Sequence, residues 1–163
     1  MKKINARVLA VAMSAVALVG TVGLTASPAA AATKCKTSTE EFPTSGFNAD
    51  VKVKLCHQRN YGGPGGSNAY DLAYATVTWS EAGSNKFDQF AVQVRVEKND
   101  VSVKSNVCDI TSRINGSASG SYTCTGTTVV NKFPDTADGT VTYNLNDDGL
   151  GKQLWQLGGT AKM

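Results

Sequence analysis

A serine-type catalytic triad in this chain would have to use its single histidine. His57 comes directly after Cys56 and is followed by Gln58 and Arg59, at the start of a glycine-rich segment. A Ser–His–Asp device needs the imidazole as its general base, and the GxSxG turn that marks the serine in one large hydrolase class is absent. We interpret His57 as a surface residue beside a structural cysteine, and we predict no enzymatic activity.

Two pairs of adjacent carboxylates could serve a glycosidase, which needs no histidine. Glu40 and Glu41 lie in a polar N-terminal segment, and Asp147 and Asp148 lie in a segment typical of a turn. Neighbouring residues on a strand point to opposite faces, and adjacent turn acids usually face water. We therefore expect neither pair to form a catalytic site.

The segment Asn144–Gly149 can be compared with a calcium-binding loop. Asn144, Asn146, Asp148 and Gly149 occupy positions 1, 3, 5 and 6 of the twelve-residue pattern. Position 1 is then Asn instead of Asp, and position 12 is Trp155 instead of the bidentate Glu. A hairpin turn at Asp148-Gly149 is the favoured interpretation, and weak calcium binding stays a minor alternative.

Four cysteines form an even set that predicts two disulfides: Cys35, Cys56, Cys108 and Cys124. Three pairings are possible, and spacing favours Cys35–Cys56 with Cys108–Cys124. A hairpin turning about residues 115–120 would place the second pair on opposite strands. Because there is no CxxC motif, we predict neither a metal site nor a cofactor.

Residues 1–32 have the pattern of a secretory signal peptide. Lys2, Lys3 and Arg7 precede the apolar run Val8–Val19, and an alanine tract ends at Ala32. Cleavage there predicts an extracellular protein of 131 residues, taken from 163, which suits one domain. The leader holds three of the 16 lysines and arginines, so 13 basic residues remain against 13 acidic ones. This balance excludes the basic surfaces that nucleic acids and membranes require.

Residues 33–46 show no periodicity, and we expect a loosely ordered N-terminal arm. Residues 47–163 form the predicted single domain. Its segments alternate between apolar and polar residues with period two, which is typical of half-buried strands. The expected strands run from about Phe47 through Leu55, and over 70–80, 87–98, 101–104, 107–114, 121–130, 139–145 and 153–157. Seven or eight such strands predict an all-β fold, an antiparallel β-sandwich that is Ig-like in general architecture.

Two surfaces are candidates for binding another protein. The arm could add as a strand to the sheet edge of a partner, and the loop from Tyr61 to Ser67 could insert into a cleft. Candidate contact residues are Lys36, Phe42, Arg59, Tyr61 and Pro64. A protease inhibitor with Lys36 or Arg59 as its P1 residue is one alternative function. A carbohydrate-binding module that stacks sugars on Tyr61 is another.

The leader ending at Ser27–Ala32, the four cysteines and the Thr/Ser/Gly-rich strands resemble small secreted proteins of actinobacteria such as Streptomyces. In size, export and expected β-architecture the chain is similar to the small linking subunit of Streptomyces umbrella toxin particles. That resemblance implies a non-enzymatic adaptor that joins other secreted proteins.

Overall fold

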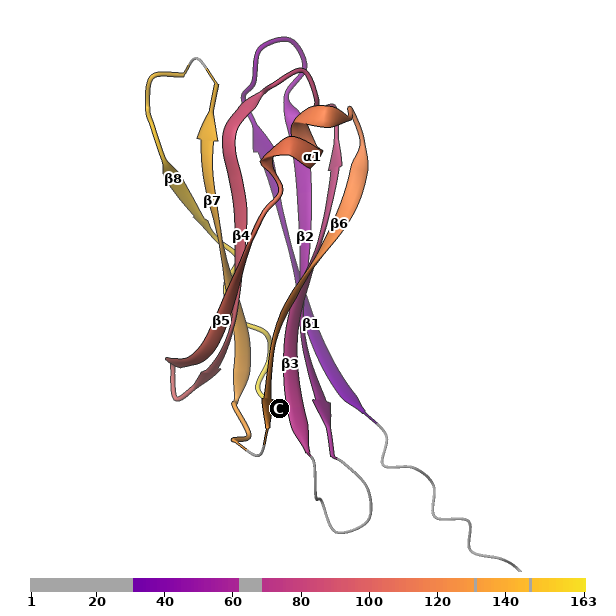
Figure 1. The fold of residues 1–163 in the computed structure, drawn as a ribbon, viewed down its shortest axis with the longest axis vertical. Helices are drawn as coiled ribbons and strands as arrows, with labels where there is room; N and C mark the ends of the chain where they lie inside the picture. Colours follow the sequence, from indigo (N-terminus) through magenta and orange to yellow (C-terminus); the bar gives the residue numbers. More distant parts are fainter. Residues whose placement is uncertain (1–30, 62–68, 131, 147) are drawn as a thin grey trace, which may run out of the picture.

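The computed structural model describes residues 31–61, 69–130, 132–146 and 148–163, and in them the chain forms two facing antiparallel sheets (Figure 1). The first sheet has the order β1-β2-β3-β6 and the second the order β5-β4-β7-β8. The elements are β1 (Ala32–Phe42), β2 (Ala49–Asn60), β3 (Tyr70–Ser80), β4 (Phe87–Lys98), β5 (Val101–Asp109), α1 (Thr111–Gly116), β6 (Gly120–Val130), β7 (Thr136–Leu145) and β8 (Gln153–Gln156). The predicted β-sandwich is confirmed.

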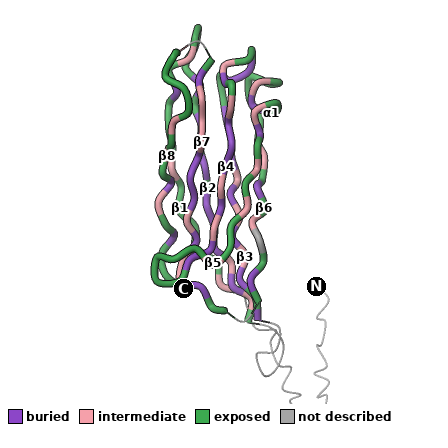
Figure 2. Tube along the Cα trace, turned by 60° about the vertical axis from the view of Figure 1, so that its left-hand side comes forward, coloured by how far each residue is buried: buried purple, intermediate pink, exposed green. Residues whose placement is uncertain are grey.

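The core lies between the sheets, where alternate residues of the inner strands meet. β2 contributes Val51, Val53 and Leu55, and β4 contributes Phe90, Val92 and Val94, all exposed by 2% or less. Buried residues concentrate in the middle strands of each sheet, whereas the edge strands are largely exposed (Figure 2). Within residues 70–80 and 87–98, for which the sequence predicts strands, alternate apolar residues such as Ala75, Val77 and Val92 face this core.

A tight turn at Asn99-Asp100 joins β4 to β5. Both residues have positive φ, of 51° and 61°. Asn and Asp tolerate this left-handed region better than most residues, and two such residues in succession match the twist of a two-residue hairpin loop.

The prediction of a loosely ordered arm over residues 33–46 is wrong for most of its length. Ala32–Phe42 pairs residue by residue with β2, from Ala32 opposite Arg59 to Phe42 opposite Ala49. The apolar alternation that reveals a half-buried strand is missing here because both faces of this edge strand are mainly exposed.

Both preferred disulfides are confirmed, but the hairpin used to explain the second is wrong. Cys35–Cys56 links neighbouring strands, whereas Cys108–Cys124 links β5 of one sheet to β6 of the other. The residues expected to form the hairpin strand 107–114 instead end β5 at Asp109 and then form α1. Asp109 Oδ1 accepts hydrogen bonds from the backbone N–H and the hydroxyl of Thr111, at 2.9 and 2.6 Å, and closes an Asx turn directly before the helix.

Helix α1 is fastened to β4 by side chains. The amide of Asn115 accepts a bond from the N–H of Phe87 and donates one to its carbonyl, at 3.1 and 2.6 Å. The Thr111 hydroxyl accepts from the N–H of Phe90 at 2.8 Å. The helix therefore covers one end of the sandwich, where the sequence suggested the end of a strand and the start of a turn.

Candidate functional site

Two of the predicted contact residues belong to the interior instead of the surface. Phe42 is only 1% exposed, because the last residue of β1 turns its ring into the core. The ring makes edge-on contacts with Phe87, Phe90, Tyr143 and Trp155, with centroids 4.8–6.0 Å apart. Its prediction as a partner-binding residue is wrong, and its role is to hold the end of β1 to the second sheet.

Arg59 is the second of these, and it is 8% exposed. Its Nε donates to Asp71 Oδ1 at 2.8 Å, and its guanidinium also reaches the carbonyl of Pro134 and lies over the ring of Phe133. A residue held this way cannot serve as an exposed P1 side chain. Its predictions as a partner contact and as an inhibitor residue are therefore wrong.

His57 lies in the same buried cluster and is fully inaccessible, so its interpretation as a surface residue is wrong. Its Nε2–H donates to Asp71 Oδ1 at 2.8 Å, while Nδ1 has no hydrogen-bond partner within the described residues. Burial lowers the pKa of His57 below its ordinary value of 6.5, although the hydrogen bond to Asp71 opposes the shift. The neutral imidazole is thus a structural element of the core.

The apolar alternation of β2 could have located these buried polar residues. Val51, Val53 and Leu55 face inward, and the same period continues to His57 and Arg59. Asp71, which is 1% exposed, faces them from β3 and was missed by the sequence analysis. A single carboxylate satisfies both partners, so the cluster carries its own charge compensation.

The remaining predicted contacts are divided between two places. Lys36 is exposed on β1, and its Nζ occupies the space that a side chain at Gly158, in the segment after β8, would need. Tyr61 is 45% exposed at the end of β2, far along the strand from Lys36. Pro64 lies outside the described residues. The structure therefore does not combine the five candidates into one surface.

The segment predicted as a turn or calcium loop joins β7 to β8. Asp148 Oδ1 accepts the N–H of Leu150 at 2.8 Å, and Gly149 has a φ of 68°, as expected for a turn. Asp147 lies outside the described residues. Among the residues that are described, no group of three His, Cys, Asp or Glu side chains could hold a metal ion.

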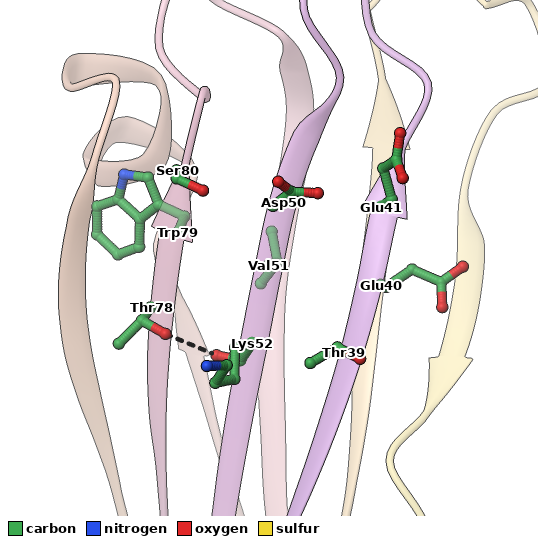
Figure 3. A pocket seen from close by; sticks show the side chains of 9 residues that line it. All are labelled: Thr39, Glu40, Glu41, Asp50, Val51, Lys52, Thr78, Trp79 and Ser80. Carbon is green, nitrogen blue, oxygen red and sulfur yellow. Dashed lines mark hydrogen bonds between the residues drawn. The ribbon is translucent and has the colours of Figure 1, made fainter.

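A shallow groove of about 560 Å³ lies on the outer face of the first sheet, across β1, β2 and β3 (Figure 3). Hydroxyl and charged side chains line it, among them Thr39, Glu41, Asp50, Lys52 and Thr78. Its aromatic residue, Trp79, is only 6% exposed and donates its indole N–H to the Ser117 carbonyl at 3.1 Å. The groove thus offers no open ring on which a sugar could stack.

The free edge of β1 is a surface with unused binding capacity. The Cα atoms of Cys35 and Cys56 are 4.1 Å apart, which is the close spacing of a non-hydrogen-bonded antiparallel pair. The N–H and C=O groups of Cys35, and of every second residue from it, therefore point away from β2. In the described part of the chain, no other strand pairs with this edge, and no backbone hydrogen bond outside the β1–β2 ladder reaches it.

The side chains of β1 carry charges of both signs in a fixed order. Lys34 and Lys36 lie near its beginning, and Glu40 and Glu41 lie near its end. Lys34, Lys36 and Glu40 share the side of the strand that faces the second sheet, since they lie opposite His57, Leu55 and Val51 of β2. None of the four charged side chains forms an ion pair within the described residues.

One polar contact connects β1 to the second sheet near the middle of the strand. The hydroxyl of Ser38 donates to the carbonyl of Leu157 at 2.9 Å. The segment after β8 otherwise bonds to β7, through Leu157 N–H to Gly139 and Thr160 N–H to Ala137. This segment therefore contacts β1 on the side that faces the second sheet and leaves the backbone edge of β1 free.

No family model matches this chain, and no curated protein and no solved structure is significantly similar to it. No helix in the described ranges is both long and apolar enough to cross a membrane. The two disulfides are those of a protein that matures in an oxidising environment. The arrangement is a disulfide-linked β-sandwich in which, within the described residues, the edge of β1 is open and carries charged side chains.

Proposed function

We propose that this chain is a secreted, non-enzymatic protein-binding module that takes up an extended segment of a partner along the free edge of β1. The observation that carries the proposal is the row of outward-directed peptide groups from Thr33 to Glu41, which the described residues leave unpaired. An added strand would satisfy them, and such main-chain hydrogen bonds supply affinity in strand-addition complexes.

The Cys35–Cys56 disulfide keeps this edge ordered before a partner binds. Because it ties β1 to β2, the edge strand cannot detach when a partner is absent. Binding to an ordered edge avoids the entropy cost of ordering a mobile arm at the moment of association. The segment would therefore accept a strand from the partner, whereas the sequence suggested that the segment itself adds to a partner's sheet.

The protein would act outside the cell, as part of a larger assembly. The leader over residues 1–32 directs the chain out of the cell, where both disulfides are stable. A rigid sandwich with an open edge at β1 suits an adaptor subunit in an extracellular complex, such as an antibacterial toxin particle. The chemistry of recognition is that of peptide groups and charged side chains, and neither a cofactor nor a nucleic acid takes part.

The alternative functions have less support in the geometry. An inhibitor would present its P1 residue on an exposed loop, yet Arg59 is buried and Lys36 lies within a paired strand. A carbohydrate-binding module would use exposed rings, but the groove of Figure 3 has none and Tyr61 lies outside it.

A single position can test the edge. The N–H of Thr37 points away from β2, so Thr37→Pro removes one edge donor without breaking the β1–β2 ladder. Thr37→Val is the matched control, because it keeps the N–H and removes only the hydroxyl. Tagged wild-type protein and both variants would be incubated with culture supernatant of the native host, and the captured proteins would be quantified by mass spectrometry.

We expect the wild type and Thr37→Val to recover a stoichiometric secreted partner, and Thr37→Pro to lose it while remaining folded. Equal recovery by a folded Thr37→Pro would show that the partner does not bind at this edge. Recovery of neither another secreted protein nor an untagged copy of this chain by the wild type would contradict the binding function itself.

A further inference from the structure

The order of charges along β1 specifies what kind of strand fits beside it. A strand running antiparallel to β1 should offer an acidic residue opposite Lys36 and a basic residue opposite Glu40. Read backwards, β1 has this order itself, since Glu41 and Glu40 then come first and Lys36 and Lys34 last. The edge is therefore complementary to a second copy of itself.

We propose that two copies of this chain associate through antiparallel pairing of their β1 strands, about a two-fold axis at Ser38. This inference rests on the proposed function, because it names the partner strand for the same edge. The two first sheets would join into one continuous sheet, and the interface would be closed and isologous, which is the commonest symmetry of protein dimers.

The hydrogen-bonding pattern of β1 is compatible with this register. Odd-numbered residues direct their peptide groups to the free edge, so they form the hydrogen-bonded pairs of an added antiparallel strand. With the axis at Ser38, Thr37 pairs with Thr39 of the second copy, and Cys35 pairs with Glu41 of the second copy. Every outward-directed group in these pairs then finds a partner of the correct kind.

The same register brings opposite charges together. Lys36 lies directly opposite Glu40 of the second copy, and the symmetry produces this pair twice. Both are non-hydrogen-bonded pairs, in which cross-strand side chains approach most closely. Parallel pairing in register would instead place each lysine beside a lysine, so the charges select the antiparallel arrangement.

Lysines on an edge strand often protect a protein against association. Protection of that kind works through charges of one sign that repel an approaching copy. In β1 the two signs are segregated along the strand, and none of these side chains is neutralised by an ion pair within the described residues. The edge therefore repels a copy in one orientation and attracts it in the other.

The test is the mass of the purified exported protein, measured by analytical ultracentrifugation over a range of concentrations. We expect a dimer whose dissociation constant rises roughly tenfold in Lys36→Glu, and likewise in Glu40→Lys, because each change creates two like-charge pairs. An equimolar mixture of the two variants should restore the wild-type affinity, since both cross-strand pairs become opposite again. The double variant Lys36→Glu/Glu40→Lys should restore it as well.

Lys54→Glu is the matched control. It reverses a charge on the outer face of β2, one strand away from the edge, and should leave the dissociation constant unchanged. A protein that is monomeric at every concentration would overturn the inference. So would a dimer that responds to neither Lys36→Glu nor Glu40→Lys, or a mixture that gains nothing over the separate variants.

The outcome also separates this inference from the proposed function. A monomer that still captures a different secreted protein in a Thr37-dependent manner would refute self-pairing and support the binding edge. A monomer without any captured partner would refute both.

Discussion

Cys108 and Cys124 join the facing edge strands of two different sheets, with their Cα atoms 5.8 Å apart. The bond closes one long side of the sandwich, where β5 and β6 also share the contact from Asn106 Nδ2 to the Thr125 carbonyl at 2.9 Å. Replacing both cysteines by serine should lower the free energy of unfolding by about 3 kcal/mol, the chain-entropy value for a loop of this size. Urea denaturation measures it, and an unchanged midpoint would show that the sheets stay together without the bond.

Phe42 should contribute far more to stability than its position near the end of an edge strand suggests. Phe42→Ala removes a ring packed against four aromatic side chains, so we expect a loss of about 3–5 kcal/mol. Phe47→Ala is the control, because Phe47 is 77% exposed and its truncation should change stability by less than about 0.5 kcal/mol. Comparable losses in the two variants would contradict the assignment of Phe42 to the core.

The stability of the protein should fall as the pH drops below 6.5. The pKa of His57 is lowered by burial in the folded state, so the unfolded chain binds a proton first. The stabilisation is complete above the ordinary value of 6.5 and is lost as the pH falls toward the lowered pKa. Protonation would also place a donor at Nδ1, which has no acceptor within the described residues.

Urea denaturation between about pH 7.5 and about pH 5 measures this dependence. His57→Gln should flatten the profile in that range, because the group that takes up the proton is gone. A wild-type profile that is already flat would mean that His57 does not titrate differently in the two states.

Two glycines should respond in opposite ways to substitution by alanine. A Cβ at Gly126 would overlap the carbonyl oxygen of Ala73, next to the register shift between β3 and β6. Gly126→Ala should therefore destabilise the protein strongly or prevent its folding. Gly116 ends α1 with open space around it, so Gly116→Ala should be neutral or stabilise by up to about 1 kcal/mol. Thermal unfolding of both variants checks the contrast, and a stable Gly126→Ala would disprove the close approach.

The central strands could be predicted because their two faces differ. Residues 70–80 and 87–98 alternate between core and solvent, and their predicted bounds are those of β3 and β4. In β1 this contrast is lost, since only Phe42 at its end is buried, and the strand resembled an irregular arm. Helix α1 is too short to display a helical period, and its N-cap residue, Ile110, is not one of the polar residues that mark a helix start in a sequence.

The candidate site was less predictable than the fold, for a physical reason. Whether Lys36 or Phe42 is a contact residue depends on which way each side chain points, and this follows from the register of β1 against β2. The period of β2 does direct Arg59 inward, but Asp71, the carboxylate that compensates its buried charge, lies on another strand. Pairing partners of this kind are not contained in the local pattern of a segment.

The two long sides of the sandwich are closed in different ways, so the sheets should resist separation less on one side than on the other. One side holds the Cys108–Cys124 covalent bond, while the β1 side meets the second sheet through the Ser38–Leu157 hydrogen bond and the ring of Phe42. Cys35–Cys56 makes β1 move with β2. Under a pulling force we expect the two sheets to separate first along β1. The disulfide between β5 and β6 should hold the opposite side together and act as the hinge.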